Sequence, residues 1–472
     1  MKVSWPALGA RYWFMSSSPR RFPNLLPGQA LMLYYGAAIL LGTVALALPV
    51  AAHGEPLSLL DALFTATSAQ CVTGLIVVDT ATRLTLFGQL VVLALMQIGG
   101  LGITTFSVYL FFYLGRGVGI RDRWLLQETL LHSPVESVGG LVRAVILLTL
   151  LIEGLGTAVL AFAFVPEMGW AKGLYFSFFH AVSAFCNAGF SLFSDSLVGY
   201  RNNGLVNAVI LTLIVLGGIG FLVMKEVGDL MRRRRSRRNR RRLSLHSRLV
   251  FLTSLILIVG GALLIGLLEV PAAFASLAPG ESLWTALFHS VSARTAGFNT
   301  IDLTLMGVPT LFLIMFLMFV GASPGSCGGG IKTTSLALFV TVLFSRLKGN
   351  PHTNVFRRTL PEAAASKVLT LVMTALLFLA LSVFALLTVQ LTGQSADTSR
   401  GAFLEYVFEA VSAFATVGLS LGATEKLQPL GKVIIIMLMF VGRVGLLTVA
   451  FTMLRRSRED AVEYAEENIM IG

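Results

Sequence analysis

Thr67-Ser-Ala-Gln-Cys-Val-Thr-Gly74 is one of four similar phrases in the 472-residue chain. The other three are Val182-Ser-Ala-Phe-Cys-Asn-Ala-Gly189, Val291-Ser-Ala-Arg-Thr-Ala-Gly297 and Val411-Ser-Ala-Phe-Ala-Thr-Val-Gly418. Each contains Ser-Ala followed by a glycine, and each ends a short apolar segment with a phenylalanine upstream. Self-similarity at a regular interval is typical of a repeat architecture. The sequence therefore predicts four copies of one structural unit.

A second phrase, rich in glycine, follows each copy of the first in the next long apolar segment. Its versions are Gly99-Gly100-Leu-Gly102, Gly217-Gly218-Ile-Gly220, Gly328-Gly329-Gly330 and Gly442-Arg443-Val-Gly445. Two aligned phrases in every unit argue against coincidence. We expect the helix that carries the second phrase to be intact in the first and second units and broken in the third.

The composition indicates a membrane protein, because 55% hydrophobic and 13% charged residues exclude a soluble globule. Apolar stretches of about 20 residues span a bilayer. Such stretches lie near residues 31–50, 84–114, 141–165, 204–224, 249–269, 305–340, 367–392 and 430–454. Shorter apolar segments, near residues 57–70, 171–186, 281–293 and 402–414, predict re-entrant helices. The predicted fold is an all-α integral membrane protein, with eight transmembrane helices and four re-entrant pore helices around one central pore.

Lysine and arginine gather after every second span, which predicts that these loops are cytoplasmic. They are Arg116, Arg121, Arg123, the run Arg232–Arg242, Arg346, Lys348, Arg357, Arg358, Arg455, Arg456 and Arg458. The run resembles a nucleic-acid tract, but its place directly after a span favours a topological and anionic-lipid role. We therefore expect the lipid bilayer and no nucleic acid as a partner, with both termini cytoplasmic.

The four phrase glycines predict a pore for cations. Irregular backbone persists at membrane depth only where it is buried in protein or lines water. Glycine allows successive carbonyls to turn toward a common axis, and a ring of carbonyl oxygens replaces the hydration shell of a cation. The alternative is that these glycines are small-residue contacts between helices, which suits the second phrase better.

Residues 321–334 interrupt the sixth span, since glycines and Pro324 weaken a helix there. A flexible interruption beneath the predicted ring of carbonyls suggests a gate. The alternative is a static kink that serves packing. The segment lacks the context of a phosphate-binding loop, because Ile331 separates the last glycine from Lys332 and no strand precedes it.

Arg443 lies within the final span, where an unpaired charge costs about 2.5 to 3.5 kcal/mol on insertion scales. We expect it to face the pore, and the alternative is a salt bridge with Glu409 or Glu153. Lys332 carries the same two interpretations.

An acidic residue follows each of the four phrase glycines. These residues would either concentrate cations at the outer mouth of the pore or cap local turns. They are Asp79, Asp195, Asp302 and Glu425. We interpret His180, His289 and Glu409 as buried structural contacts rather than ligands, and we assign no chemistry to the three cysteines.

Two other classes of protein fit less well. An enzyme would need convergent nucleophile, base or metal ligands, and no such motif recurs, so we predict that the chain is not an enzyme. A transporter with inverted repeats would show copies of alternating polarity, whereas these four share one polarity.

Further phrases carry a resemblance to a known family over nearly the whole chain. With Arg294-Thr-Ala-Gly-Phe-Asn-Thr300, Gly325-Ser-Cys-Gly-Gly-Gly-Ile-Lys-Thr-Thr334 and Tyr464-Ala-Glu-Glu-Asn-Ile-Met-Ile-Gly472, the sequence resembles the Trk/Ktr/HKT superfamily of potassium transporters, and within it the KtrB-type membrane subunits. The resemblance implies potassium uptake. It also implies a selectivity filter at Gly74, Gly189, Gly297 and Gly418.

The remaining implied K+ ligands are the carbonyl groups of Val72, Thr73, Asn187, Ala188, Thr295, Ala296, Thr416 and Val417. Glycine at all four filter positions implies a preference for potassium. The resemblance also implies an intramembrane gate formed by Gly325, Ser326, Cys327, Gly328, Gly329, Gly330, Lys332 and Arg443.

The resemblance further implies a homodimer, with one pore per subunit, on a cytosolic KtrA-type regulatory ring in a bacterial cytoplasmic (inner) membrane. ATP or ADP is expected on that ring and no cofactor in this chain, with K+ as the transported ion and Na+ as a candidate activator. The alternative function is a secondary cation transporter with less selective K+/Na+ permeation. The expected divisions are a cytoplasmic segment 1–30, repeats at 31–125, 135–230, 249–348 and 365–456, a basic loop 231–248 and a cytoplasmic tail 457–472.

Overall fold

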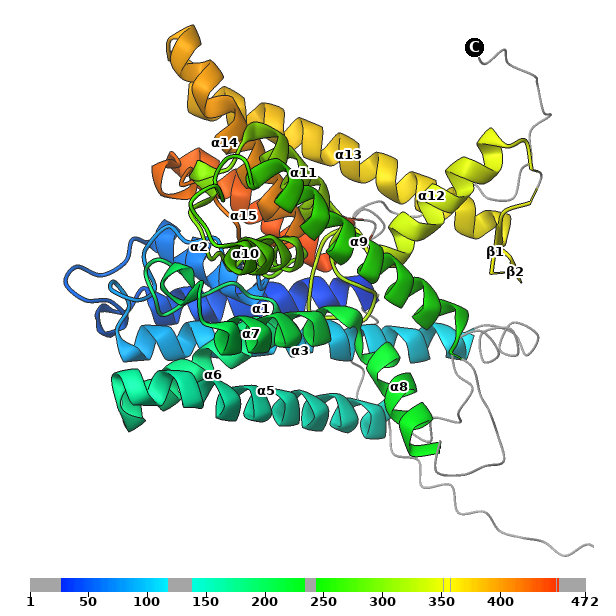
Figure 1. Cartoon of the computed structure of the whole chain (residues 1–472), viewed down its shortest axis with the longest axis horizontal. Helices are drawn as coiled ribbons and strands as arrows, with labels where there is room; N and C mark the ends of the chain where they lie inside the picture. Colours follow the sequence, from blue (N-terminus) through cyan, green and yellow to red (C-terminus); the bar gives the residue numbers. More distant parts are fainter. Residues whose placement is uncertain are drawn as a thin grey trace, which may run out of the picture.

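The computed structural model describes residues 27–117, 138–233, 243–350, 352–356, 358–446 and 448–449, which are mostly helical (Figure 1). The first two groups of helices are α1 (Pro27–Leu46), α2 (Leu59–Gln70) and α3 (Leu86–Gly117), then α5 (Val138–Met168), α6 (Trp170–Cys186), α7 (Gly204–Ile219) and α8 (Phe221–Arg233). The third group is α9 (Leu245–Glu269), α10 (Pro279–Ser292), α11 (Val308–Phe319) and α12 (Thr333–Leu347). The fourth is α13 (Glu362–Leu391), α14 (Ala396–Ala415) and α15 (Pro429–Val444).

The remaining regular elements are short. Single 3-10 turns cover Pro49–Ala51, Val198–Tyr200, Leu303–Leu305 and Thr424–Lys426. An antiparallel hairpin of β1 (Asn354–Val355) and β2 (Arg358–Thr359) joins α12 to α13. Most of the predicted N-terminal segment, half of the basic loop and the whole C-terminal tail lie outside the described residues.

Four helices are long and apolar enough to cross a membrane within the described residues, and each opens one of the four groups. They are α1, α5, α9 and α13, and a fifth span is counted if α7 and α8 are taken together. Large apolar side chains on these helices stay exposed to the surroundings, for example Phe162 on α5 and Phe384 on α13. Lipid is the solvent that makes such a surface favourable. The full set of eight spans stays a prediction.

In the second and third groups, the last span is divided into two shorter helices, so neither half is long enough to count as a membrane span by itself. The axes of α7 and α8 differ by 101° at Gly220. The second unit was expected to keep this helix intact, and that expectation is wrong. In the third group residues 320–332 separate α11 from α12, as expected.

Each group also contains a shorter helix at one of the predicted re-entrant segments, namely α2, α6, α10 or α14. Side chains define where two of these begin: Ser58 accepts a hydrogen bond from the Asp61 amide, and Ser395 accepts one from the Thr398 amide. Two of them end at left-handed residues, Asn187 after α6 and Thr416 after α14. A left-handed residue stops a helix and redirects the chain.

Four large hydrophobic clusters show how the groups pack. One cluster joins the first and second groups through residues such as Met96 and Phe179. Another joins the second and third, a further one the third and fourth, and the last joins the fourth back to the first. The groups therefore form a closed circle in chain order, with α5 and α13 at opposite edges in Figure 1 and the short helix α10 between them.

Candidate ion pathway

Gly74, Gly189, Gly297 and Gly418 lie edge to edge in a closed ring. A methyl group on any of them would collide with the backbone of the next loop in chain order, and the fourth closes on the first. The carbonyl oxygens so approached belong to Ala188, Ala296, Val417 and Thr73, in that order. Each of those residues directly precedes a glycine of the ring. The structure thus brings all four predicted glycines together, at a contact distance that only glycine permits.

The loops share an unusual backbone conformation. The four glycines have φ between 71° and 94°. The residue two positions before each glycine is also left-handed, with φ between 51° and 72°, although it carries a side chain. These residues are Val72, Asn187, Thr295 and Thr416. Left-handed backbone at non-glycine residues is strained and is found at functional sites. Alternating left-handed residues let successive carbonyls face one side.

The serine of each phrase braces its loop, a role that sequence reasoning did not assign. The hydroxyls of Ser68 and Ser412 each accept a hydrogen bond, at 3.1 Å, from the amides of Gly74 and Gly418. The equivalent hydroxyls of Ser183 and Ser292 donate to the carbonyls of Phe190 and Phe298. The recurrence of Ser-Ala in all four phrases was the signal that could have revealed this bracing.

Side chains also hold the segments that follow the glycine in the second and fourth loops. Buried His180 lies 3.0 Å from the Ser191 hydroxyl, and the Ser420 hydroxyl donates to buried Glu409 at 3.1 Å. These are the structural contacts that we expected. Between loops, the Asn187 amide and the Thr295 hydroxyl lie 3.2 Å apart, and they pair best when the amide oxygen faces Thr295.

Five of the second-phrase glycines show two kinds of close contact. Gly99, Gly217 and Gly442 each lie directly against a carbonyl at the end of a short helix, so that a methyl group would not fit. Gly328 and Gly329 instead lie against the hydroxyl-bearing side chains of Thr295 and Thr416. The third unit is therefore not equivalent to the others here, because its loop directly contacts Thr295 and Thr416, two left-handed residues of the phrase loops.

Residues 320–332 are anchored at the bend between α7 and α8. Amide nitrogens of Ser323 and Cys327 donate to the carbonyls of Gly218 and Gly217, at 2.9 and 3.0 Å. In return, the Phe221 amide, which begins α8, donates to the Gly325 carbonyl at 3.0 Å. Lys332 folds back on the same loop, with Nζ 2.7 Å from the Gly328 carbonyl. The loop thus fills the space where helix α7 would otherwise have continued.

Arg443 is buried and connects three separate parts of the chain. Its Nη1 donates to the Cys327 carbonyl in the loop, and its Nη2 donates to the Gly99 carbonyl on α3 at 2.7 Å. Its Nε lies 3.2 Å from the hydroxyl of Tyr35 on α1. The alternative of a salt bridge is wrong for this arginine within the described residues, since Glu153 pairs with Gln97 and Glu409 pairs with Ser420.

Three of the four acidic residues beyond the ring accept a hydrogen bond from a nearby backbone amide. Asp79 accepts from the Ala81 amide, Asp195 from the Gly199 amide and Asp302 from the Thr304 amide. Glu425 lies exposed in a 3-10 turn. A partly buried ion pair between Asp61 and Lys432, at 2.5 Å, joins α2 to α15 nearby.

In the part of the chain that the structure describes, no three His, Cys, Asp or Glu side chains gather to hold a metal ion. The three cysteines are buried and unpaired by disulfides. Hard monovalent cations take oxygen ligands, and the residues directly before the ring glycines carry backbone carbonyls close to the neighbouring loops.

Apolar outer helices around a ring of backbone loops define a membrane protein of the transport class. A family model described as TrkH, cation transport protein, matches residues 29–463. The chain therefore belongs to the TrkH family of cation transport proteins, which confirms the resemblance found in the sequence.

Similar proteins agree with this family. The chain is 40% identical to the Ktr system potassium uptake protein B of Bacillus subtilis, over 96% of this chain and 98% of that protein. It is 37% identical to the Ktr system potassium uptake protein B of Vibrio alginolyticus, over 94% of each chain. It is also 37% identical to the potassium/sodium uptake protein NtpJ of Enterococcus hirae, over 95% of this chain and 98% of that protein.

The fold is similar to the crystal structure of the potassium transporter TrkH from Vibrio parahaemolyticus, with a TM-score of 0.72 and 19% identity. The match covers 92% of this chain and 86% of that one. The relatives are transport proteins, in agreement with the prediction that the chain is not an enzyme.

Proposed function

We propose that this chain is the ion-translocating subunit of a potassium uptake system in a bacterial cytoplasmic membrane. The closed ring of Gly74, Gly189, Gly297 and Gly418 is the observation that carries the proposal. Relatives of similar length are named as potassium uptake proteins, two of them as protein B of a Ktr system. Potassium is the substrate of the site rather than a resident cofactor.

The filter works through backbone oxygens. Carbonyls from the two residues before each glycine, together with the glycines themselves, replace the hydration shell of K+ at the axis. These residues are Val72, Thr73, Asn187, Ala188, Thr295, Ala296, Thr416 and Val417. Because serine hydroxyls and a continuous edge-to-edge ring hold the loops, the carbonyls keep their spacing when the ion leaves.

The loop 321–334 and Arg443 form the gate on one side of this ring. Gly325, Ser326, Cys327, Gly328, Gly329, Gly330 and Lys332 belong to the loop. Arg443 pins the loop to α3 through two carbonyls, and it brings a positive charge to the path of a cation. Opening of the gate then requires these hydrogen bonds to break. The bond from the Phe221 amide to the Gly325 carbonyl gives α8 a second point of attachment through which it could move the loop.

The assembly proposed for the cell follows the Ktr relatives. The chain pairs as a homodimer, with both termini cytoplasmic, and binds a KtrA-type ring that carries ATP or ADP. Sodium acts as an activator in this scheme. A second candidate is a secondary cation transporter with less selective K+/Na+ permeation, which the name of the Enterococcus relative favours.

Growth and uptake in cells that lack their own potassium uptake test the proposal. Wild type, expressed with a regulatory ring, is expected to restore growth at limiting K+. Gly297→Ser is expected to lose at least about tenfold in K+ affinity, equal to about 1.4 kcal/mol. Gly260→Ala is the matched control, because Gly260 lies in α9 with open space around its Cα.

Two results would overturn the proposal. Well-expressed wild type that fails to restore growth would remove the potassium uptake function. A Gly297→Ser protein of normal expression and unchanged affinity and selectivity would remove the filter assignment alone.

A further inference from the structure

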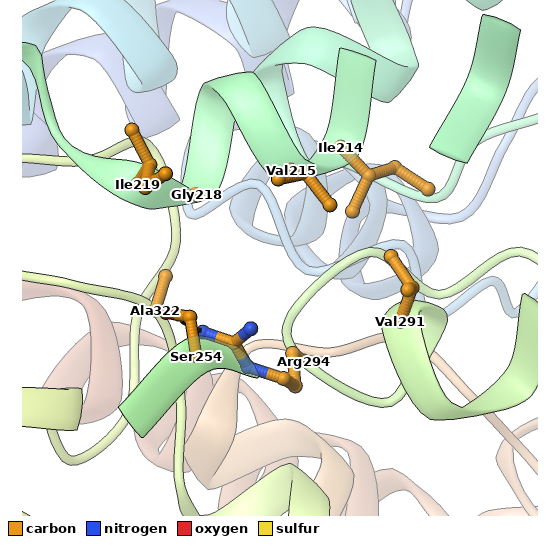
Figure 2. Close-up of a pocket in the computed structure, with 8 residues that line it drawn as sticks. All are labelled: Ile214, Val215, Gly218, Ile219, Ser254, Val291, Arg294 and Ala322. Carbon is orange, nitrogen blue, oxygen red and sulfur yellow. Dashed lines mark hydrogen bonds between the residues drawn. The ribbon is translucent and has the colours of Figure 1, made fainter. Parts of the chain in front are cut away.

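A small cavity lies next to Arg294, in the third loop of the ring. It has a volume of about 20 Å³ and lies between α7, α9, the end of α10 and the loop 320–332. Its lining includes Ile214, Val215, Gly218, Ser254, Arg294 and Ala322 (Figure 2). A space of roughly 10 to 15 Å³ on this measure holds one water molecule. The cavity therefore admits one particle slightly larger than water.

Arg294 supplies an uncompensated charge to this cavity. Its side chain is 8% exposed, and the guanidinium lies beside Ser254 and Ala322 in Figure 2. Its Nη2 donates to the Ser254 hydroxyl at 3.1 Å, while its buried Nε has no hydrogen-bond partner. Among the residues that the structure describes, no acidic side chain lines the cavity. A buried, unpaired cation at membrane depth is costly, and an arginine carries five donors to satisfy.

The hydrogen-bonding groups at the cavity are donors. Arg294 presents the unsatisfied Nε–H, and Ser254, which accepts from Arg294, still has its own hydroxyl proton to donate. The remaining side chains of the lining are apolar. Donors around a positive charge recognise an anion, and a space for one particle slightly larger than water fits a monatomic anion.

We propose that this cavity binds one halide ion, chloride under physiological conditions, between Arg294 and Ser254. The halide neutralises the guanidinium of Arg294. Arg294 directly precedes Thr295, which belongs to the third loop of the ring. Binding stabilises the third loop and makes protein stability depend on halide. The inference concerns a binding site and stands whether or not the ring conducts potassium.

Bromide locates the site directly. We expect crystals of the full-length protein grown in bromide to show an anomalous peak in the cavity, within hydrogen-bond distance of Arg294 Nε. The peak is expected to disappear in Arg294→Gln. A cavity without bromide, including one that holds only a water molecule in bromide-grown crystals, would overturn the proposal.

Thermal melting of purified protein at constant K+ gives a second readout. Replacing chloride by gluconate is expected to lower the wild-type melting temperature by about 2 °C, and bromide is expected to restore it. Arg294→Gln should lose this dependence. Val215→Phe should lose it too, because it fills the cavity and leaves the arginine in place.

Arg201→Gln is the matched control. Arg201 also has a buried Nε without a partner, but it does not line the cavity. This variant is expected to keep the wild-type response to halide. Equal melting temperatures in chloride and gluconate for wild type, or an equal loss of the response in Arg201→Gln, would contradict a specific site.

Discussion

Arg443 on α15 donates a hydrogen bond from Nη1 to the carbonyl oxygen of Cys327, in the loop between α11 and α12. The same guanidinium reaches Gly99 on α3 through Nη2. One side chain thus joins the fourth group of helices to the third and the first. These two bonds go to backbone carbonyls, and charge-assisted bonds of this kind contribute about 1.5 to 3 kcal/mol each.

Arg443→Gln is expected to raise the maximal rate of K+ uptake by about tenfold, because losing one such bond corresponds to at least about 1.4 kcal/mol. Initial uptake by proteoliposomes, corrected for the amount of protein, measures this. Arg443→Lys keeps the charge but loses the forked geometry, so an intermediate rate is expected. A rate of Arg443→Gln at or below that of wild type would show that the arginine does not restrain the gate.

Shortening the loop within Gly325–Gly330 is expected to raise the maximal flux, since the loop then no longer reaches both the bend at Gly220 and Arg443. Flux should rise while the K+ affinity stays within about twofold, because the ring is untouched. The melting temperature of the variant shows whether the fold persists. A folded variant with wild-type flux would leave the loop as a static packing element.

Gly329→Ala is expected to change the K+/Na+ selectivity, because the new methyl group would collide with the side chain of Thr416. Thr416 precedes Gly418 by two residues and shares its strained loop. The double variant Gly329→Ala with Thr416→Ala is expected to recover selectivity, with a coupling of about 1 kcal/mol.

Competition of Na+ with Rb+ uptake measures this coupling between gate and filter. Gly260→Ala serves as the comparison, since Gly260 lies in the helix α9 and nothing lies within 4 Å of a methyl group added there. Strictly additive effects of Gly329→Ala and Thr416→Ala would refute a direct contact between the loop and the filter.

Ser412→Ala is expected to destabilise the protein by about 1 to 2 kcal/mol, because it leaves the Gly418 amide without its buried acceptor. Selectivity should fall at the same time, since the loop loses its brace. Ser382→Ala is the matched control: its hydroxyl only bonds back to the Phe378 carbonyl along α13. Equal losses of selectivity in the two variants would argue against a specific role of the phrase serine.

Recurrence made the central feature of the structure predictable. The four glycines were found because each stands at the end of the same phrase, and the structure brings all four into one ring. The helices α2, α6, α10 and α14 cover the expected short segments, because these segments are more polar than the long spans. α14 begins at Ala396, earlier than the expected residue 402, so its length did not distinguish it from a span.

The partners of Arg443 and the bend at Gly220 were not predictable. Arg443 binds the carbonyls of Cys327 and Gly99, and every residue has a carbonyl, so no side-chain pattern marks them. The bend at Gly220 depends on the loop that docks there from a distant part of the chain. Gly-Gly-Ile-Gly alone is equally compatible with a straight helix that packs closely.

Anomalous scattering from crystals grown with Rb+ or Tl+ in place of K+ tests the central claim most directly. We predict ion peaks on the axis of the ring, surrounded by the carbonyls that precede Gly74, Gly189, Gly297 and Gly418. The peaks should weaken when Na+ replaces these ions. Well-occupied peaks at side-chain carboxylates elsewhere, with none inside the ring, would contradict the assignment of the ring as the filter.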